Sequence, residues 1–420
     1  MTEKKEKIYA HLDEGGQIVL PPELLSRHRM KPGTRFLVNE NANSFKLVSP
    51  TRLAKLYIEP TNRCNLECRT CIRNTWEGAQ GMMSDEVFDR IIKGLRAFSP
   101  PPSVFFGGLG EPLYHPKIVD MVAQAKQLGS YVELITNGTL LTVDLSKRLL
   151  TAGIDMLWVS LDGASPESYA DNRIGAKLSE VIGNISQFSK ILRTEGKSIG
   201  CCGFISKYKA QLGIVFVAMK RNIHDLPAVL GLGRKLGAKR FMVTNVLPYT
   251  QEMQDEILYA KLLGVSNYPS ISLPRMEDSD IMREPLRGVM DRMNLTLATG
   301  NSQMSGNHCP FIEGGAGAIG WDGGLSPCLP LLHSHTSFSV PSQRFSRCWT
   351  IGNVTDHSLA ALWYASEHVA FRERVLNFDF PPCVSCGGCD LAEKNEEDCY
   401  GNFFPTCGAC LWAQGVIQCP

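Results

Sequence analysis

The feature that most constrains the fold is a sixfold alternation of apolar strand-like runs and amphipathic helical runs between residues 55 and 246. Repeated strand–helix units require a parallel sheet with right-handed crossovers. Six units are too few for a closed eight-stranded barrel, so we predict an α/β fold built on an open, partial (β/α)6 barrel. Its function should lie at the carboxyl ends of the strands. The predicted strands are 55–59, 103–106, 131–135, 156–160, 213–218 and 240–245.

Composition narrows the class of protein. The chain has 420 residues, of which 44% are hydrophobic and 20% charged, as in an ordinary soluble protein of two to four domains. A formal net charge of +1 argues against a polybasic binder of nucleic acid or membrane surfaces. The first residues are charged and no apolar run reaches about eighteen residues, so we expect no secretory signal, no membrane span and a cytoplasmic location.

The fifteen cysteines are distributed unevenly. None precedes Cys64, three lie within residues 64–71, two are adjacent at Cys201 and Cys202, and ten lie between Cys309 and Cys419. Without a secretory signal, ligation of metals or clusters is a better interpretation than disulfide bonding. The adjacent pair belongs to no spaced motif, and we expect buried or incidental thiols there.

Three of these cysteines directly follow the first predicted strand. Cys64, Cys68 and Cys71 form a CxxxCxxC motif. Three thiolates from one tight loop hold a metal or an iron–sulfur cluster better than they form disulfides, and a cluster with three ligands leaves one iron open. From these residues alone a zinc knuckle is the alternative.

A glycine-rich turn follows the second predicted strand, in the sequence Phe105-Phe-Gly-Gly-Leu-Gly-Glu-Pro112. Glycines directly after a strand let the backbone approach a ligand closely, and Glu111 can pair with an ammonium group. The third and fourth strands also end in small polar residues, for which ordinary turn chemistry is the alternative.

The cysteine motif after the first barrel strand resembles that of the radical S-adenosylmethionine (SAM) enzymes. The resemblance implies that Cys64, Cys68 and Cys71 bind a [4Fe-4S] cluster whose fourth iron is chelated by SAM. It also implies reductive cleavage of SAM to a 5′-deoxyadenosyl radical. The family often has an aromatic residue where this chain has Thr70, which weakens the expected contact with adenine but not cluster binding.

The same resemblance assigns SAM-binding roles at the barrel mouth. Gly107, Gly108 and Glu111 match the family's GGE motif, which holds the SAM amino group. The family contacts the SAM ribose and carboxylate from the ends of the next strands and from a following arginine. The matching residues here are Asn137, Ser160, Asp162 and Arg173.

Residues 306–420 are rich in glycine, proline and cysteine. We expect bound clusters or metals, and not apolar burial alone, to hold this region together. Gly323-x4-Cys328 and the later CxxC pairs resemble the SPASM-type extension of radical SAM maturases, which implies one or two auxiliary [4Fe-4S] clusters. The candidate ligands are Cys309, Cys328, Cys383, Cys386, Cys389, Cys399, Cys407, Cys410 and Cys419, with Cys348 as a spare thiol.

The cysteine spacing leaves two questions open. The family spacing is CxxCx5Cx3C, whereas this chain has CxxCxxC and a second CxxC, so individual cysteines are not assigned to individual clusters. In addition, Cys386-x2-Cys389 and Cys407-x2-Cys410 have the spacing of a zinc ribbon, which is the alternative to clusters.

Residues 1–50 form a separate small unit in this interpretation. The segments Gly16-Gln-Ile-Val-Leu-Pro and Lys31-Pro-Gly-Thr-Arg-Phe-Leu-Val resemble the AbrB-like swapped-hairpin module, which implies an interleaved homodimer and often DNA binding. A unit of this length cannot bury much apolar surface on its own. It must therefore dimerise or dock on the rest of the chain. Acidic residues offset its positive charges and leave no basic stripe, so DNA binding is not favoured.

The predicted order is therefore an AbrB-like module (1–50), a radical SAM core (51–250), a connecting segment (251–305) and a SPASM-like domain (306–420). This order and the ending 395–420 resemble the radical SAM maturases associated with tungsten-containing aldehyde:ferredoxin oxidoreductases. The resemblance implies that the substrate is the tungsten–pterin cofactor or its host enzyme, and that ferredoxin or flavodoxin donates electrons. The alternatives are a SPASM-type peptide (RiPP) maturase and a cluster-bearing regulator that binds DNA.

Overall fold

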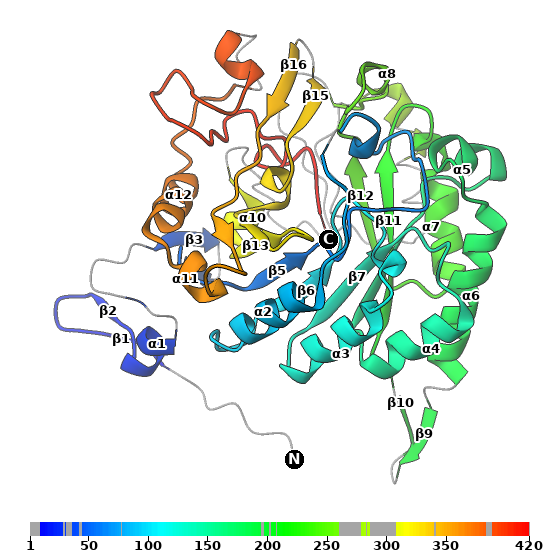
Figure 1. The fold of residues 1–420 in the computed structure, drawn as a ribbon, viewed down its shortest axis with the longest axis horizontal. Helices are drawn as coiled ribbons and strands as arrows, with labels where there is room; N and C mark the ends of the chain where they lie inside the picture. The colour runs from blue at the N-terminus through cyan, green and yellow to red at the C-terminus, as the bar shows by residue number, and fades with distance from the viewer. Residues whose placement is uncertain are drawn as a thin grey trace.

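The fold is built around one large sheet. The computed structural model describes residues 9–27, 30, 36–41, 44–76, 78–194, 197–200, 203–206, 208–259, 279–282, 284–285, 308–339, 342–383 and 389–419. Within these residues the central sheet has nine strands, in the order β12-β11-β8-β7-β6-β5-β13-β14-β17 (Figure 1).

The six predicted barrel strands are all present and pair in parallel, which confirms the α/β fold with an open partial barrel. They form because buried β-branched and aromatic residues recur in short runs that end at glycine or polar residues. Their bounds are β5 (Lys55–Ile58), β6 (Ser103–Phe106), β7 (Val132–Thr136), β8 (Met156–Ser160), β11 (Gln211–Ala218) and β12 (Arg240–Asn245).

Helices cover the outside of these strands (Figure 1). In α2 (Asp85–Leu95) the side chains of Val87, Ile91 and Leu95 are buried on one face, and the Ser84 hydroxyl caps the helix by accepting a hydrogen bond from the Val87 amide. The other crossover helices are α3 (Ile118–Gln127), α4 (Val143–Ala152), α5 (Pro166–Asn172), α6 (Leu178–Thr194) and α7 (Leu226–Lys235).

The C-terminal region continues the barrel sheet, which the sequence did not predict. Strand β13 (Ala316–Ile319) pairs in parallel with β5, and β14 (Gly324–Ser326) and β17 (Gly352–Asn353) extend the sheet in antiparallel fashion. The other elements are α8 (Gln251–Gln254), α10 (Pro310–Glu313), β15 (His335–Ser339), β16 (Ser342–Ser346), α11 (Leu359–Trp363) and α12 (Ser366–Asn377).

Apolar burial contributes more to the C-terminal region than expected. Phe311 and Phe371 pack in one buried cluster with Tyr57, Phe105 and Trp158 of the barrel strands. At roughly 25 cal/mol per Å2 of apolar surface, such aromatic contacts stabilise the region substantially even without clusters.

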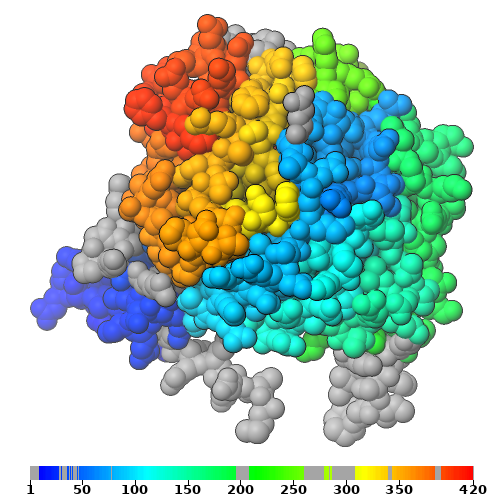
Figure 2. All heavy atoms as spheres, in the orientation of Figure 1, coloured from blue at the N-terminus to red at the C-terminus, as the bar shows by residue number. Residues whose placement is uncertain are grey.

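The N-terminal unit consists of small antiparallel pairs. Strand β1 (His11–Leu12) pairs with β2 (Ile18–Val19), α1 (Pro22–Arg27) follows, and β3 (Leu37–Asn41) pairs with β4 (Ser44–Val48). The unit lies at one corner of the molecule, in dark blue, against the orange and cyan surface of the rest of the chain (Figure 2), and Arg27 of α1 lines a small cavity with Phe98 and Tyr364. Its elements agree with the predicted ones, while the AbrB-like resemblance stays a prediction.

A hairpin of β9 (Lys197–Gly200) and β10 (Gly203–Ser206) projects from the body between α6 and β11 (Figure 1). Cys201 and Cys202 lie outside the described residues. Among the helices of the described part of the chain, none has the length and apolar character needed to cross a membrane.

Candidate active site and cysteine groups

The three motif cysteines lie on the loop between β5 and α2, at the carboxyl end of the first barrel strand. Each sulfur lies next to a nitrogen donor from a different position in the chain. Two of these donors are guanidinium groups, which favour thiolate or cluster-bound sulfur over a neutral thiol. The contacts are Asn137 Nδ2 to Cys64 Sγ at 3.8 Å, Arg173 Nη1 to Cys68 Sγ at 3.9 Å and Arg73 Nε to Cys71 Sγ at 3.3 Å.

The raised pKa values of the loop thiols are compatible with a bound group of positive charge. Burial raises the pKa of the Cys64 and Cys68 thiols, and the neighbouring cysteines raise both values further. Arg73 lowers the pKa of Cys64 and Arg173 lowers that of Cys68, but neither effect prevails. A metal cluster supplies the positive charge that would ionise Cys64 and Cys68, so the donor set fits a cluster held by the three cysteines.

The glycine-rich turn after β6 is hydrogen-bonded to the cysteine loop. The Glu111 amide donates to the Arg63 carbonyl at 2.9 Å, and the Gly107 amide donates to the Ile58 carbonyl at 3.0 Å. Gly108 has a φ of +143°, and a Cβ there would lie 2.7 Å from the Glu59 side chain. Only glycine permits this backbone conformation and this close approach.

Glu111 is buried, and burial raises the pKa of its carboxyl group. The carboxylate accepts hydrogen bonds from the Leu113 amide, the Thr136 hydroxyl and the Asn137 amide at 2.7–3.0 Å. Glu111 therefore fixes the turn to the end of β7, a role that sequence reasoning did not assign. A carboxylate has about four acceptor positions, so one remains for an ammonium group.

Asp162 and Arg173, both predicted to face SAM, pair with each other. Arg173 Nη2 lies 2.6 Å from Asp162 Oδ2, and the Val217 amide donates to Asp162 Oδ1 at 2.8 Å. Burial opposes the charge of the guanidinium, but Asp162 and Cys68 outweigh burial and raise the pKa of Arg173. Asp162 thus holds Arg173 toward the Cys68 sulfur, while Ser160 ends β8 as a buried residue.

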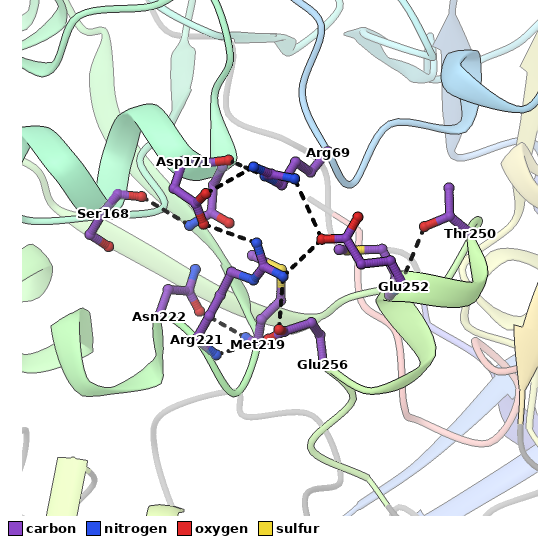
Figure 3. A network of polar contacts seen from close by, with 11 residues as sticks. Arg69, Ser168, Asp171, Met219, Arg221, Asn222, Thr250, Glu252 and Glu256 are labelled. Atoms are coloured by element: carbon purple, nitrogen blue, oxygen red, sulfur yellow. Dashed lines mark hydrogen bonds and ion pairs between the residues drawn. The ribbon is translucent and has the colours of Figure 1, made fainter.

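A network of ion pairs holds the outer side of the cysteine loop (Figure 3). Arg69 lies between Cys68 and Thr70, and Arg221 follows β11; both contact Asp171 of α5 and Glu252 of α8 at 2.9–3.5 Å. Arg221 also reaches Glu256 at 2.9 Å. The network ties the loop to α5 and α8, and its partly exposed pairs contribute modestly to stability.

Four tail cysteines line one cavity of about 60 Å3: Cys309, Cys328, Cys407 and Cys410. The side chain of Arg344 from β16 also lines this cavity. Burial raises the pKa of all four thiols, that of Cys309 to about 12. This donor set, with a guanidinium beside it, fits a cluster with four thiolate ligands.

A second group of cysteines lies around Cys383. Burial raises the pKa of Cys383, Arg344 lowers it, and Cys389 and Cys399 are near enough to raise it further. Cys386, predicted to join them, lies outside the described residues. The zinc-ribbon alternative pairs Cys386 and Cys389 with Cys407 and Cys410; of these, Cys407 and Cys410 line the four-cysteine cavity and Cys389 does not. Among the described residues, no three His, Cys, Asp or Glu side chains converge closely enough to hold a single metal ion.

Two further tail cysteines, outside the Cys383 group, do not line the four-cysteine cavity either. Cys419 is partly buried near Lys55, and its sulfur accepts a hydrogen bond from Trp412 Nε1 at 3.3 Å; desolvation raises its pKa to about 11. Cys348, the predicted spare thiol, lines a separate cavity beside the cysteine loop.

Sequence reasoning missed three residues that support the site, namely Glu59, Arg69 and Arg73. The sequence offered two signals for these roles: two arginines lie within or just after the cysteine motif, and a glutamate ends the preceding strand. Their roles depend on partners far along the chain, which spacing does not show.

Comparison with known proteins agrees with this geometry. Residues 58–205 match the family model of the radical SAM superfamily, and residues 309–390 match the SPASM iron–sulfur cluster-binding domain. The chain therefore contains a radical SAM domain followed by a SPASM domain, the domain composition of a radical SAM enzyme. Its cofactors are a [4Fe-4S] cluster and SAM, with auxiliary iron–sulfur clusters in the SPASM domain.

Particular relatives extend the comparison over most of the chain. A protein from Pyrococcus furiosus named "Tungsten-containing aldehyde ferredoxin oxidoreductase cofactor-modifying protein" is 28% identical over 368 residues, or 87% of this chain and 96% of the relative. The crystal structure of Streptococcus suis SuiB bound to precursor peptide SuiA is similar in fold (TM-score 0.54, 15% identity, 90% of this chain and 74% of SuiB). The S-adenosylmethionine-bound form of SuiB gives a TM-score of 0.53, with 16% identity over 83% of this chain and 73% of SuiB.

Proposed function

We propose that this enzyme matures a tungsten-containing oxidoreductase by radical SAM chemistry, acting on the tungsten–pterin cofactor or on its host enzyme. The observation that carries the proposal is a cysteine loop whose three sulfurs each meet a donor, in a chain that aligns with nearly the whole P. furiosus relative. Ferredoxin or flavodoxin is the proposed electron donor.

When bound, the [4Fe-4S] cluster and SAM supply reductive cleavage of SAM and a 5′-deoxyadenosyl radical. The chain's own residues would hold the cluster and SAM in position. Cys64, Cys68 and Cys71 would hold the cluster, and the turn of Gly107, Gly108 and Glu111 would bind the SAM amino group. Asn137, Ser160, Asp162 and Arg173 complete the proposed SAM site at the barrel mouth, where Asn137 and Arg173 donate to sulfur.

We also propose the cysteine groups as the auxiliary sites. Cys309, Cys328, Cys407 and Cys410 would hold one cluster, and Cys383, Cys386, Cys389 and Cys399 the other. Arg344 would lower the negative charge of both. Cys419 does not line the four-cysteine cavity and is then not needed as a ligand.

The test of the catalytic step is anaerobic SAM cleavage. After reconstitution and reduction, the enzyme should release 5′-deoxyadenosine, and Cys64→Ala should lower that rate at least about 100-fold because the cluster loses one of three ligands. Cys202→Ala, outside every spaced motif, is the matched control and should keep the rate. Intact clusters without any SAM cleavage would refute the proposal.

A second candidate function is that of a SPASM-type peptide maturase. The observation that favours it is the similarity in fold between this chain and SuiB, which was solved with a bound precursor peptide. Co-purification separates the two. The proposed function expects a tungsten oxidoreductase to be retained by the tagged enzyme, whereas the second candidate expects a short precursor peptide.

A further inference from the structure

A cavity of about 620 Å3 lies between the end of the cysteine loop and the SPASM region. Thr75, Trp76 and Ala79 form one wall, and residues between Gly320 and Thr350 form the other. In Figure 2 the yellow to orange residues of the second wall adjoin the blue residues of the first. The volume lies within the usual range for small-ligand sites of roughly 300–1,000 Å3.

The first wall is held in place by residues at the start of the cysteine loop. The Thr61 hydroxyl donates to the Gly81 carbonyl at 2.6 Å, and Asn62 bonds the Gly81 amide at 2.8 Å and the Ala79 carbonyl at 2.9 Å. Gly81 in turn lies under the Trp321 ring, so closely that a Cβ there would meet the ring at 2.2 Å. Trp321 belongs to the second wall, and its contact with Gly81 connects that wall to the segment that forms the first.

One carboxylate connects this cavity to the SAM-binding turn. Glu59 is almost completely buried; its Oε1 accepts from the Leu109 amide at 2.9 Å, within the Gly107–Glu111 turn. Its Oε2 lies 2.8 Å from Nε2 of His333, which lines the cavity. The His333 ring lies 4.6 Å from the Trp76 ring, between centroids. The cavity therefore opens beside the place where the radical would be formed.

The lining indicates the class of ligand. Two indoles (Trp76 and Trp321) and two imidazoles (His333 and His335) offer flat surfaces for a ring. Asp322 presents a carboxylate whose Oδ1 accepts from the Gly324 amide, leaving Oδ2 without a donor among the described residues. The described lining includes neither lysine nor arginine, so it is not suited to a polyanion.

We propose that this cavity binds a planar heteroaromatic ring with adjacent N–H donors, the class to which pterins belong. The ring would lie against Trp76 and His333 and donate its N–H groups to Asp322. This inference rests on the proposed function, in which a pterin cofactor is the substrate.

The test uses the full-length reconstituted enzyme and free neopterin as the probe, in anaerobic equilibrium dialysis. We expect saturable one-to-one binding that Asp322→Asn weakens at least tenfold, because the variant keeps the bond to Gly324 but loses an acceptor and its charge. Trp76→Leu should weaken binding severalfold through loss of ring contact. Asp356→Asn, an exposed aspartate away from the cavity, is the control and should bind as the wild type does.

Two outcomes would overturn the inference: no neopterin binding by the wild type, or binding that both Asp322→Asn and Trp76→Leu leave unchanged. SAM cleavage is measured on the same preparations. Normal cleavage without neopterin binding refutes the cavity assignment alone, whereas absence of cleavage refutes the proposed function.

Discussion

At the scale of single residues, the paired Asp162 and Arg173 differ from the exposed network around Arg221 in their expected contribution to stability. The side chains of Arg173 and Asp162 are 12% and 1% exposed, so water screens their pair little. The Arg221 partners Asp171 and Glu252 are 43% and 55% exposed, and water screens those pairs strongly. The third partner, Glu256, is 15% exposed, but Arg221 itself is 23% exposed.

We expect Arg173→Gln to lower the free energy of unfolding by about 3 kcal/mol, because it leaves the Asp162 carboxylate buried without its cation. Arg221→Gln is the matched variant and should cost about 1 kcal/mol or less. The two changes are compared through the thermal unfolding midpoints of the two variants, each measured on anaerobic holoenzyme. Equal midpoints for the two variants would contradict this account of the buried pair.

At the scale of secondary structure elements, α12 contains a buried histidine. His368 packs edge-on against the Trp363 ring, with 4.9 Å between centroids. Burial, together with a smaller contribution from the nearby Arg372, lowers its pKa from 6.5 to about 2. The folded protein therefore keeps His368 neutral at pH values where the unfolded chain would protonate it.

The sign of the resulting pH dependence follows from proton counting. Between pH 6.5 and 2 the unfolded state binds one more proton at this residue, so stability falls as the pH falls below about 6.5, by about 1.4 kcal/mol per pH unit. His368→Phe should remove this contribution between pH 7.5 and 5.5 in thermal denaturation. The exposed His357→Phe should leave the wild-type slope; a wild-type slope in His368→Phe would exclude His368 as its source.

The six barrel strands could be predicted to within two residues because each is a short apolar run bounded by a turn. Strand β13 could not, because Ala316-Gly-Ala-Ile carries no alternation, and its pairing with β5 joins segments more than 250 residues apart. The same limit applies to the tail cysteines: spacing predicted that they bind clusters, but only the fold brings Cys309 and Cys328 to Cys407 and Cys410.

At the scale of the whole molecule, the cysteine groups predict the metal content. We expect about twelve irons per chain, with about four lost in Cys328→Ser and about four in Cys383→Ser, because each variant removes a proposed ligand of a different cluster. Iron and zinc analysis of anaerobic protein provides the measurement. About four irons with tightly bound zinc in the wild type would contradict the two auxiliary clusters.

The N-terminal unit predicts self-association. Tyr9, Leu12, Val38 and Phe45 are each at least 57% exposed, and isolated two-stranded hairpins are marginally stable. We expect the full chain to dimerise through residues 1–50 and a chain lacking them to be monomeric, as measured by light scattering. A monomeric full-length chain would contradict this expectation.

The pairing of β13 with β5 also bears on electron transfer. Strand β5 leads into the cysteine loop, while Cys309 precedes β13 by a few residues and Cys328 follows β14 by two. Continuous backbone hydrogen bonds therefore join the segments that carry the proposed ligands of two redox centres. Tunnelling between these centres would occur over a distance set by sheet geometry, and the rate should be insensitive to domain motion or solvent viscosity.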